Sequence, residues 1–142
     1  VGSRGSSSAE RRPRVLVAED NTVNQTLCRV VLTRVGYEVV IACDGLEAIR
    51  LFRASLARGS RSRFAVVFMD LAMPNCDGFE ATAAIRDLEA EQEHYVPTAI
   101  VGLTANSSEE DIARCKEVGM VEVLPKPFRK AMLIEAVQRY SR

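Results

Sequence analysis

Residues 66–78 read VVFMDLAMPNCDG, an apolar run that stops at an acid, Asp70. A short run rich in Val and Phe is typical of a strand buried on both faces, and the Pro, Asn and Gly that follow are typical of a turn. A carboxylate at the end of such a strand is costly to bury, so it needs a cation or hydrogen-bond donors nearby. Asp70 therefore predicts a functional group at the end of a buried strand.

Short apolar runs alternate with helical stretches on both sides of this segment, and the strands are apolar throughout. Such strands belong to a parallel sheet that helices cover on both faces through right-handed crossovers. We therefore expect an α/β fold, a doubly wound parallel sheet of five strands with five helices in a single domain. The predicted strands are Val15–Ala18, Glu38–Ala42, Ala65–Met69, Thr98–Gly102 and Val121–Leu124, and the helical stripes that should cover them include Gly45, Ile49, Phe52 and Leu56, and Leu133, Ala136, Val137 and Tyr140.

Three expected helix starts carry the capping-box pattern, in which Ser or Asp precedes Glu by three residues. This role explains Asp77 without a functional site, and Pro74 and Gly78 shape the turn beside it. The three pairs are Asp44 with Glu47, Asp77 with Glu80, and Ser107 with Glu110, and the expected C-terminal caps are Gly36 and Gly119.

The composition narrows the function classes. The 142 residues are 47% hydrophobic, which suits one domain with a sizeable core. Residues 1–12, rich in Gly, Ser and Arg, are interpreted as a flexible linker or a cloning remnant, and residues 13–142 as the domain. Lys plus Arg and Asp plus Glu number 19 each, so no strong field favours nucleic acid or an anionic membrane, and no apolar stretch is long enough to span one.

The four cysteines have no CxxC pair, and one histidine, His94, cannot complete a zinc site with them. We expect reduced, structural thiols and a cytoplasmic location. Cys76 is read as structural although it lies near Asp70, and His94 is not expected to carry a phosphoryl group. Met69 and Met73 are read as packing residues.

Polar residues follow four of the five predicted strands: Glu19 and Asp20, Asp70, Thr104, and Lys126. Ligands of a doubly wound sheet bind at the carboxyl ends of its strands, so these side chains should converge. Three close carboxylates need a cation, and an incomplete set of oxygen ligands suits Mg²⁺. Since no nucleotide-binding motif is present, we expect the phosphoryl group to arrive on another donor and to form an aspartyl phosphate.

The segments VLVAEDNTVNQ, VVFMDLAMPNCDGFEA, VGLTAN and LPKPF, in this order, resemble the receiver domains of two-component response regulators, particularly those of hybrid histidine kinases. The resemblance covers residues 13–142. It implies a flavodoxin-like fold with strand order 2-1-3-4-5 and a cis peptide bond between Lys126 and Pro127.

The resemblance also implies the roles of the site residues. Asp70 would be the phosphoacceptor, with Mg²⁺ as cofactor. A histidine kinase or histidine phosphotransfer domain would be the partner, and the domain would be a monomer. The implied metal ligands are Glu19, Asp20, Asp70 and the carbonyl of Ala72, and the implied phosphoryl contacts are Thr104, Ala105 and Lys126.

Two departures from the family leave alternatives open. Val123 stands where the family usually has a switch Tyr or Phe, so we favour a phosphoryl relay over a conformational output. Ala72 offers no side chain to orient or block water, which leaves the phosphoryl lifetime open, although Asn106 could partly replace it. The first helix carries Val23, Leu27, Val30 and Val31, more apolar residues than a sheet-facing stripe needs, so its exposed part is a predicted partner surface. The surface of the fourth helix and fifth strand is the alternative.

Three function classes are weighed against one another. The first is a stoichiometric phosphoacceptor, with slow autodephosphorylation as its only catalysis, that forms part of a hybrid histidine kinase. The second is a pseudo-receiver that acts only as an interaction module. The third is an aspartyl phosphatase, which requires a second acid where this chain has Ala72. A free regulator and a domain of a longer sensor both remain open.

Overall fold

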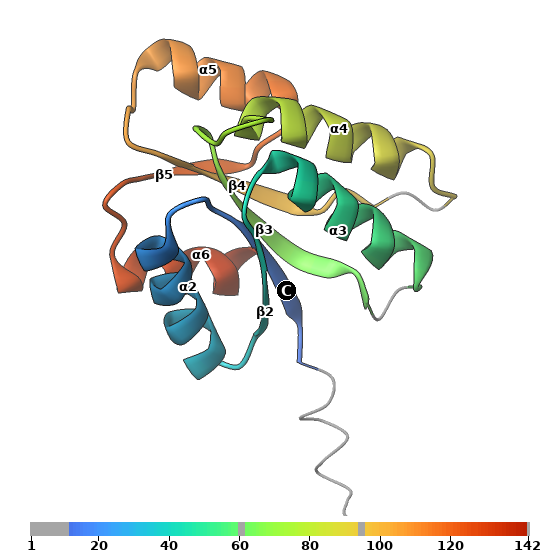
Figure 1. Cartoon of the computed structure of the whole chain (residues 1–142), viewed down its shortest axis with the longest axis horizontal. Coiled ribbons are helices and arrows are strands. Elements are labelled where there is room, and N and C mark those ends of the chain that lie inside the picture. The colour runs from blue at the N-terminus through green and yellow to red at the C-terminus, as the bar shows by residue number, and fades with distance from the viewer. Residues whose placement is uncertain (1–11, 60–61, 94–95, 142) are drawn as a thin grey trace, which may run out of the picture.

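In the computed structural model, described for residues 12–59, 62–93 and 96–141, strands and helices alternate along the chain (Figure 1). All strand pairs are parallel, and their order is β2-β1-β3-β4-β5. The described residues thus form the predicted flavodoxin-like sheet. Its elements are β1 (Arg14–Ala18), α2 (Thr22–Arg34), β2 (Glu38–Ala42), α3 (Gly45–Ala57), β3 (Phe64–Asp70), α4 (Gly78–Ala90), β4 (Ala99–Thr104), α5 (Glu109–Val118), β5 (Glu122–Pro125) and α6 (Lys130–Tyr140).

Strands β3, β4 and β5 each end further along the chain than we predicted. Asp70 and Thr104, expected just after their strands, are the last residues of β3 and β4. Each is held by a neighbouring strand, since Asp70 pairs in register with Leu103, and Thr104 pairs with Pro125. Both side chains are therefore carried on rigid strand backbone rather than on loops.

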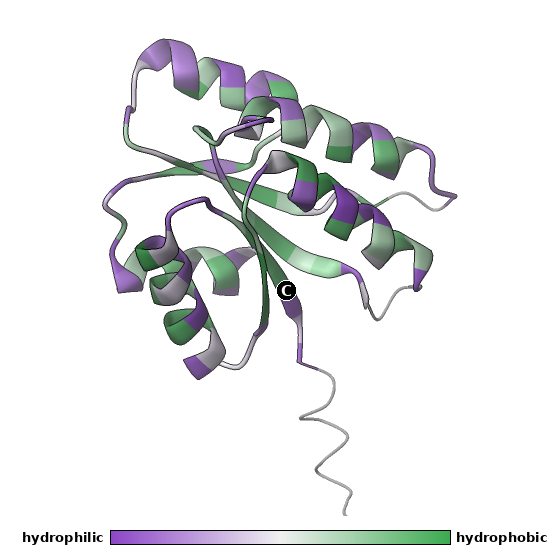
Figure 2. Ribbon diagram, in the orientation of Figure 1, coloured by the Kyte–Doolittle hydropathy of each residue, from purple (hydrophilic) through white to green (hydrophobic). Residues whose placement is uncertain are grey.

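The helices form two layers. Helices α2 and α6 cover one face of the sheet, while α3, α4 and α5 cover the other (Figure 1). Apolar residues fill the strands between the layers, whereas the helices turn their polar residues outward (Figure 2). The core on the α2 and α6 side includes Cys28 and Leu133, and the core on the opposite side includes Phe52 and Ile85. Sheet and helices therefore bury both faces, as the continuous apolar strands predicted.

Most of the predicted caps are confirmed, and one is wrong by a residue. Asp77 and Glu80 form a complete capping box at the start of α4. Helix α5 is capped by Ser108, whose hydroxyl accepts a hydrogen bond from the Asp111 amide, and not by Ser107. Each of these two serines has an acid three residues later, so the sequence could not separate them.

Some predictions fall on residues that the structure does not describe. Residues 1–11 and His94 lie outside the described ranges, and Arg12 and Pro13 precede β1 without helix or strand. Within the described ranges, no helix is both long and apolar enough to cross a membrane. All four cysteines are free in the structure, and only Cys43 is exposed.

Candidate functional site

The centre of the site is a lysine that bridges two buried acids. Lys126 Nζ lies 2.8 Å from Asp70 Oδ2 and 2.8 Å from Glu19 Oε1. Glu19 follows β1, Asp70 ends β3 and Lys126 follows β5, so the carboxyl ends of three parallel strands bring them together. The Glu19 side chain is fully buried and that of Asp70 is 4% exposed, whereas Lys126 is 18% exposed. A half-buried ammonium thus compensates part of the charge of two buried carboxylates.

The start of α2 holds Glu19 in place. The backbone amide of Asn21 donates to Glu19 Oε2 at 3.0 Å, and the side-chain amide of Asn24 donates to Glu19 Oε1 at 3.3 Å. Gln25 Nε2 donates to the Glu19 carbonyl at 2.6 Å. Asn21 also caps the helix, because its side-chain oxygen accepts a hydrogen bond from the Asn24 amide. The first turn of α2 therefore positions Glu19 at the end of β1.

The two buried acids differ in their affinity for protons. Burial raises the pKa of Asp70 to about 6, and the neighbouring Glu19 charge adds to this effect, although Lys126 opposes it. Burial also opposes ionisation of Glu19, but hydrogen bonds from Lys126 and from the Asn21 amide outweigh it and lower the pKa of Glu19. Burial likewise disfavours the charged lysine, yet its bonds to the two carboxylates raise the pKa of Lys126. Lys126 alone does not fully compensate the acids.

A third acid completes a site that suits a divalent cation. Glu19, Asp20 and Asp70 each place one carboxylate oxygen within 4.8 Å of the others, and Asp20 is exposed. Three carboxylates against one ammonium leave an excess of negative charge, which agrees with the raised pKa of Asp70. An all-oxygen set that is open to solvent on one side fits Mg²⁺, which keeps several of its waters. The residues present therefore fit the predicted metal.

Thr104 lies beside this group at the end of β4. Its hydroxyl donates to the Asn106 carbonyl at 2.8 Å and accepts from the Asn106 amide at 3.0 Å. Thr104 is 5% exposed, while Ala105 and Asn106 are exposed. The Thr104 carbonyl accepts from the Lys126 amide at 2.7 Å, so the residues after β4 and β5 are tied together. In this structure the Thr104 hydroxyl is bonded within its own turn.

Ala72 follows Asp70 on an exposed loop between β3 and α4. The Ala72 amide donates to Asp70 Oδ1 at 3.2 Å. At the other end of the loop, the Gly78 amide donates to the Leu71 carbonyl, and a Cβ on Gly78 would lie 2.3 Å from the Asp70 carbonyl oxygen. Only glycine allows α4 to begin this close to the end of β3. The start of α4 thus fixes the backbone on either side of Ala72.

Residues 15–138 match the family model described as the response regulator receiver domain. The chain belongs to this family. It is a receiver domain of two-component phosphorelay signalling, and its acidic cluster is consistent with the magnesium-binding phosphoacceptor site of such domains.

Three similar proteins illustrate the kinds of receiver domain that this chain resembles. Probable histidine kinase 2 of Oryza sativa subsp. indica is 38% identical over 94% of this chain, which spans only 14% of that protein. The receiver domain of sensor histidine kinase PA1611 from Pseudomonas aeruginosa, solved with magnesium in its active-site cleft, is 35% identical with a TM-score of 0.76 and covers 92% and 98% of the two chains. The receiver domain of Ssk1, solved with the Saccharomyces cerevisiae histidine phosphotransfer protein Ypd1, is 28% identical with a TM-score of 0.78 and covers 92% and 90%.

Val123 stands where we expected a switch aromatic, and the structure shows what surrounds this residue. Val123 lies on β5 opposite Gly102 on β4. A Cβ on Gly102 would lie 2.8 Å from Met120 Sδ, 3.4 Å from Leu71 Cδ2 and 3.6 Å from Val123 Cγ2. The Met120 side chain therefore occupies the space that a side chain at position 102 would need. Val123 is half-buried beside Gly102. No aromatic ring is available at this position for the family's usual switch.

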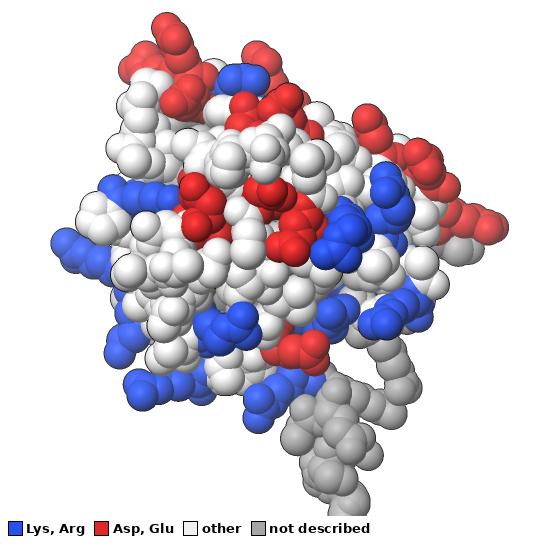
Figure 3. Space-filling view, in the orientation of Figure 1, with Lys and Arg blue, Asp and Glu red and all other residues white. Residues whose placement is uncertain are grey.

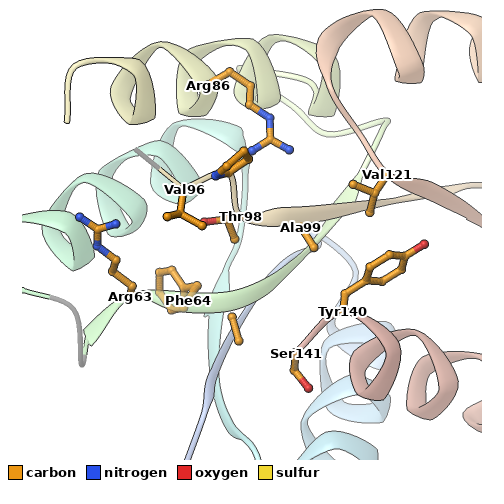
Figure 4. A pocket seen from close by; sticks show the side chains of 11 residues that line it. Arg63, Phe64, Arg86, Val96, Thr98, Ala99, Val121, Tyr140 and Ser141 are labelled. Carbon is orange, nitrogen blue, oxygen red and sulfur yellow. The ribbon is translucent and has the colours of Figure 1, made fainter. Parts of the chain in front are cut away.

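A hollow elsewhere on the receiver does not belong to the site. It measures about 340 Å³ and is lined by residues at the amino ends of β3 and β4, including Phe64 and Ala99, and by Tyr140 and Ser141 from the end of α6 (Figure 4). Asp70 and Thr104 end the same two strands. The hollow thus lies at the opposite edge of the sheet from the acidic cluster.

The structure brings together most of the predicted site and adds residues that the sequence did not reveal. Glu19, Asp70 and Lys126 are in direct contact, and Asp20 lies with the two other acids. The ion pair between Lys126 and Glu19 was not predicted, because the sequence gives no distance between separate strand ends. The support of Glu19 by Asn24 and Gln25 was also missed. Both follow the acidic pair within two helical turns, which is the signal that could have found them.

Proposed function

We propose that Asp70 of this receiver accepts a phosphoryl group from a phosphohistidine and holds it as an aspartyl phosphate, in a reaction that requires Mg²⁺. The observation that carries this proposal is the bridge from Lys126 to Asp70 and Glu19 at 2.8 Å each, which holds a buried carboxylate at a strand end where a donor can reach it. If Asp70 served only to form an ion pair with Lys126, a second buried carboxylate, Glu19, would not be needed on the same ammonium group.

The proposed step is a displacement at phosphorus. An Asp70 carboxylate oxygen forms the new bond to phosphorus while the bond from phosphorus to the histidine nitrogen breaks, and the imidazole keeps the electron pair. Lys126 neutralises charge on the transferred group. Thr104 exchanges its bond to Asn106 for a phosphoryl oxygen, and the Ala105 amide donates to another. Positioning and electrostatic stabilisation supply most of the catalysis in such transfers.

Glu19, Asp20, Asp70 and the Ala72 carbonyl are the residues that we propose to hold Mg²⁺. The bound ion would neutralise the excess negative charge of the acids and of the incoming phosphoryl group. Burial is the main cause that raises the pKa of Asp70 to about 6, and the negative charge of Glu19 adds to it. The methyl side chain of Ala72 has no atom that can bind a metal, so only its backbone carbonyl would serve as a ligand.

The partner surface that we propose is the exposed side of α2. Val23 is 73% exposed and Val30 is 46% exposed, and they form an apolar patch with Thr22, Thr26 and Leu27. Val31, from the same apolar set, is buried against the sheet, so the exposed part of the set is Val23, Leu27 and Val30. Helix α2 begins directly after the acidic pair, so a helical histidine phosphotransfer domain seated there would bring its histidine close to Asp70. The Ssk1 receiver was solved with such a protein, Ypd1.

The whole protein is proposed to be a hybrid histidine kinase in which this domain is a monomeric receiver in the cytoplasm. The chain spans 14% of the rice histidine kinase and 7% of the Dictyostelium discoideum hybrid histidine kinase I, to which it is 36% identical. These two proteins, each named as a histidine kinase, support a larger sensor rather than a free regulator.

Phosphorylation by acetyl phosphate tests the function without a partner. The chain is incubated with acetyl phosphate and Mg²⁺ and weighed intact by mass spectrometry. We expect the mass to rise by one phosphoryl group. This rise should not occur when excess EDTA removes Mg²⁺ from the reaction, nor in the Asp70→Asn variant. Because Asn keeps the shape of the side chain but is a poor nucleophile, the variant should remain folded. A pseudo-receiver would show no gain, and an equal gain in Asp70→Asn would place the acceptor elsewhere.

A further inference from the structure

The loop between β3 and α4 is tied to the start of α3 by a pair of residues that the proposed chemistry does not use. Asn75 Nδ2 donates to Asp44 Oδ2 at 3.0 Å. The other oxygen of Asp44 accepts from the Glu47 amide at 2.8 Å and so caps α3. One carboxylate therefore fixes two structures, the first turn of α3 and the tip of the neighbouring loop.

The backbone of the loop is shaped for this contact. Asn75 has a φ of 69°, the one positive value at a described residue other than glycine, and the Cys76 amide donates to the Pro74 carbonyl at 2.7 Å across it. Asn tolerates this left-handed region better than other side chains do, apart from glycine. The resulting tight turn directs the Asn75 side chain to Asp44.

A second contact presses the same two segments together. A Cβ on Gly45 would lie 2.3 Å from the carbonyl oxygen of Cys76, so the first residue of α3 packs directly on the loop backbone. The Glu47 amide and then Asn75 lower the pKa of Asp44, so its carboxylate is charged at neutral pH and its bond to Asn75 is charge-assisted. Asp44, Gly45, Asn75 and Cys76 together form what we call the loop clasp.

The contacts that Gly78 makes with Asp70 and Leu71 close the base of the loop, and the loop clasp holds its tip. Ala72 lies between Leu71 and Asn75; its amide is bonded to Asp70 Oδ1, but its methyl side chain offers no polar contact to hold the carbonyl. We propose that Asp44 and Asn75 are positioning residues that hold the Ala72 carbonyl in place as a metal ligand, and so set the affinity of the site for Mg²⁺. This inference rests on the proposed function, since it gives the loop its task in the same site.

Two variants break the clasp without disturbing its surroundings. Asn75→Gly removes the hydrogen bond and still allows a positive φ. Asp44→Ser keeps an oxygen that can cap α3 and removes the one that holds Asn75. Glu122→Gln, which alters an exposed ion pair with Arg139 near α6, is the control.

The test is a Mg²⁺ titration followed by backbone amide chemical shifts, together with amide hydrogen exchange of residues 71–77 without metal. We expect each single variant to weaken Mg²⁺ binding about five-fold, as the loss of one such bond implies, and to speed metal-free exchange in the loop. The double variant should be no weaker than either single one, because both lose the same bond. Glu122→Gln should match the wild type in both measurements.

The possible outcomes distinguish a failure of the loop-clasp proposal from a failure of the proposed function. Unchanged Mg²⁺ affinity in both single variants, or losses that add in the double variant, would overturn the clasp while the wild type still binds Mg²⁺ and accepts phosphate from acetyl phosphate. If the wild type itself neither binds Mg²⁺ nor accepts phosphate, the proposed function fails, and with it the basis of the clasp.

Discussion

Asp70 is a carboxylate that the fold buries at a cost. Its side chain is 4% exposed, and its charge is compensated by one lysine that it shares with Glu19. Burial and the Glu19 charge raise its pKa to about 6, so ionising this carboxyl costs more in the metal-free fold than in water. Stability given up at a functional residue is expected where the group must bind a cation and react. The cost of burying the ionised Asp70 is thus electrostatic, and it should be measurable as a pH-dependent change in the free energy of unfolding.

Asp70→Asn should stabilise the metal-free protein in a pH-dependent way. Because the folded pKa is above the ordinary value of 3.8, the contribution of Asp70 to stability is present below about pH 4 and is lost as pH rises to about 6. Asn does not titrate and still offers Lys126 an acceptor. We expect a gain on the order of 2 kcal/mol above pH 6 that vanishes near pH 4, measured by urea unfolding in EDTA.

Asp87→Asn on the exposed side of α4 is the control for the change in net charge, and it should show no such pH dependence. A gain for Asp70→Asn that is as large at pH 4 as at pH 8 would contradict the electrostatic account, as would no gain at either pH.

Helix α2 has two tasks on its two sides. Its inward side, with Cys28, Val31 and Leu32, is buried against the sheet. Its outward side exposes the apolar patch around Val23 and Val30, which nothing in the described chain covers. Lysine and arginine side chains gather on the α2 and α6 side of the molecule, whereas acids gather over α4 and α5 (Figure 3). A partner that seats on α2 therefore meets an apolar patch in basic surroundings.

Val23→Asp should separate docking from chemistry. A charge in the middle of the patch should slow transfer from a phosphorylated histidine phosphotransfer protein at least about ten-fold, since a few central apolar residues dominate most interfaces. Labelling by acetyl phosphate should stay unchanged, because Val23 does not touch Asp70. The probe is phosphorylated yeast Ypd1, and transfer is followed by gel autoradiography.

The matched control is Val96→Asp, which changes an equally exposed valine, 68% exposed, at the opposite edge of the sheet. Transfer to Val23→Asp at the wild-type rate would show that the partner does not use α2.

Over the whole molecule, the features that depend on local sequence pattern could be predicted. The strand runs, the strand order implied by the family resemblance and the acids at the strand ends all appear in the structure. Predictions that needed tertiary distances were incomplete. Ser107 and Ser108 offered similar capping chemistry, and the pattern of α2 did not separate its exposed valines from the buried Val31. The bridge from Lys126 to Glu19 had no sequence signal. The bond between Asp44 and Asn75 joins residues that lie 31 positions apart, and only the fold reveals it.

The most direct test of the central claim is a crystal structure of this chain grown with Mg²⁺ and beryllofluoride, a mimic of the phosphoryl group. We predict beryllium bonded to an Asp70 oxygen, with Thr104, the Ala105 amide and Lys126 on its fluorides. Mg²⁺ should lie about 2.1 Å from oxygens of Glu19 or Asp20, Asp70 and the Ala72 carbonyl, with water completing the octahedron. Beryllofluoride absent from Asp70 at saturating concentration, or Mg²⁺ bound away from these acids, would contradict the account.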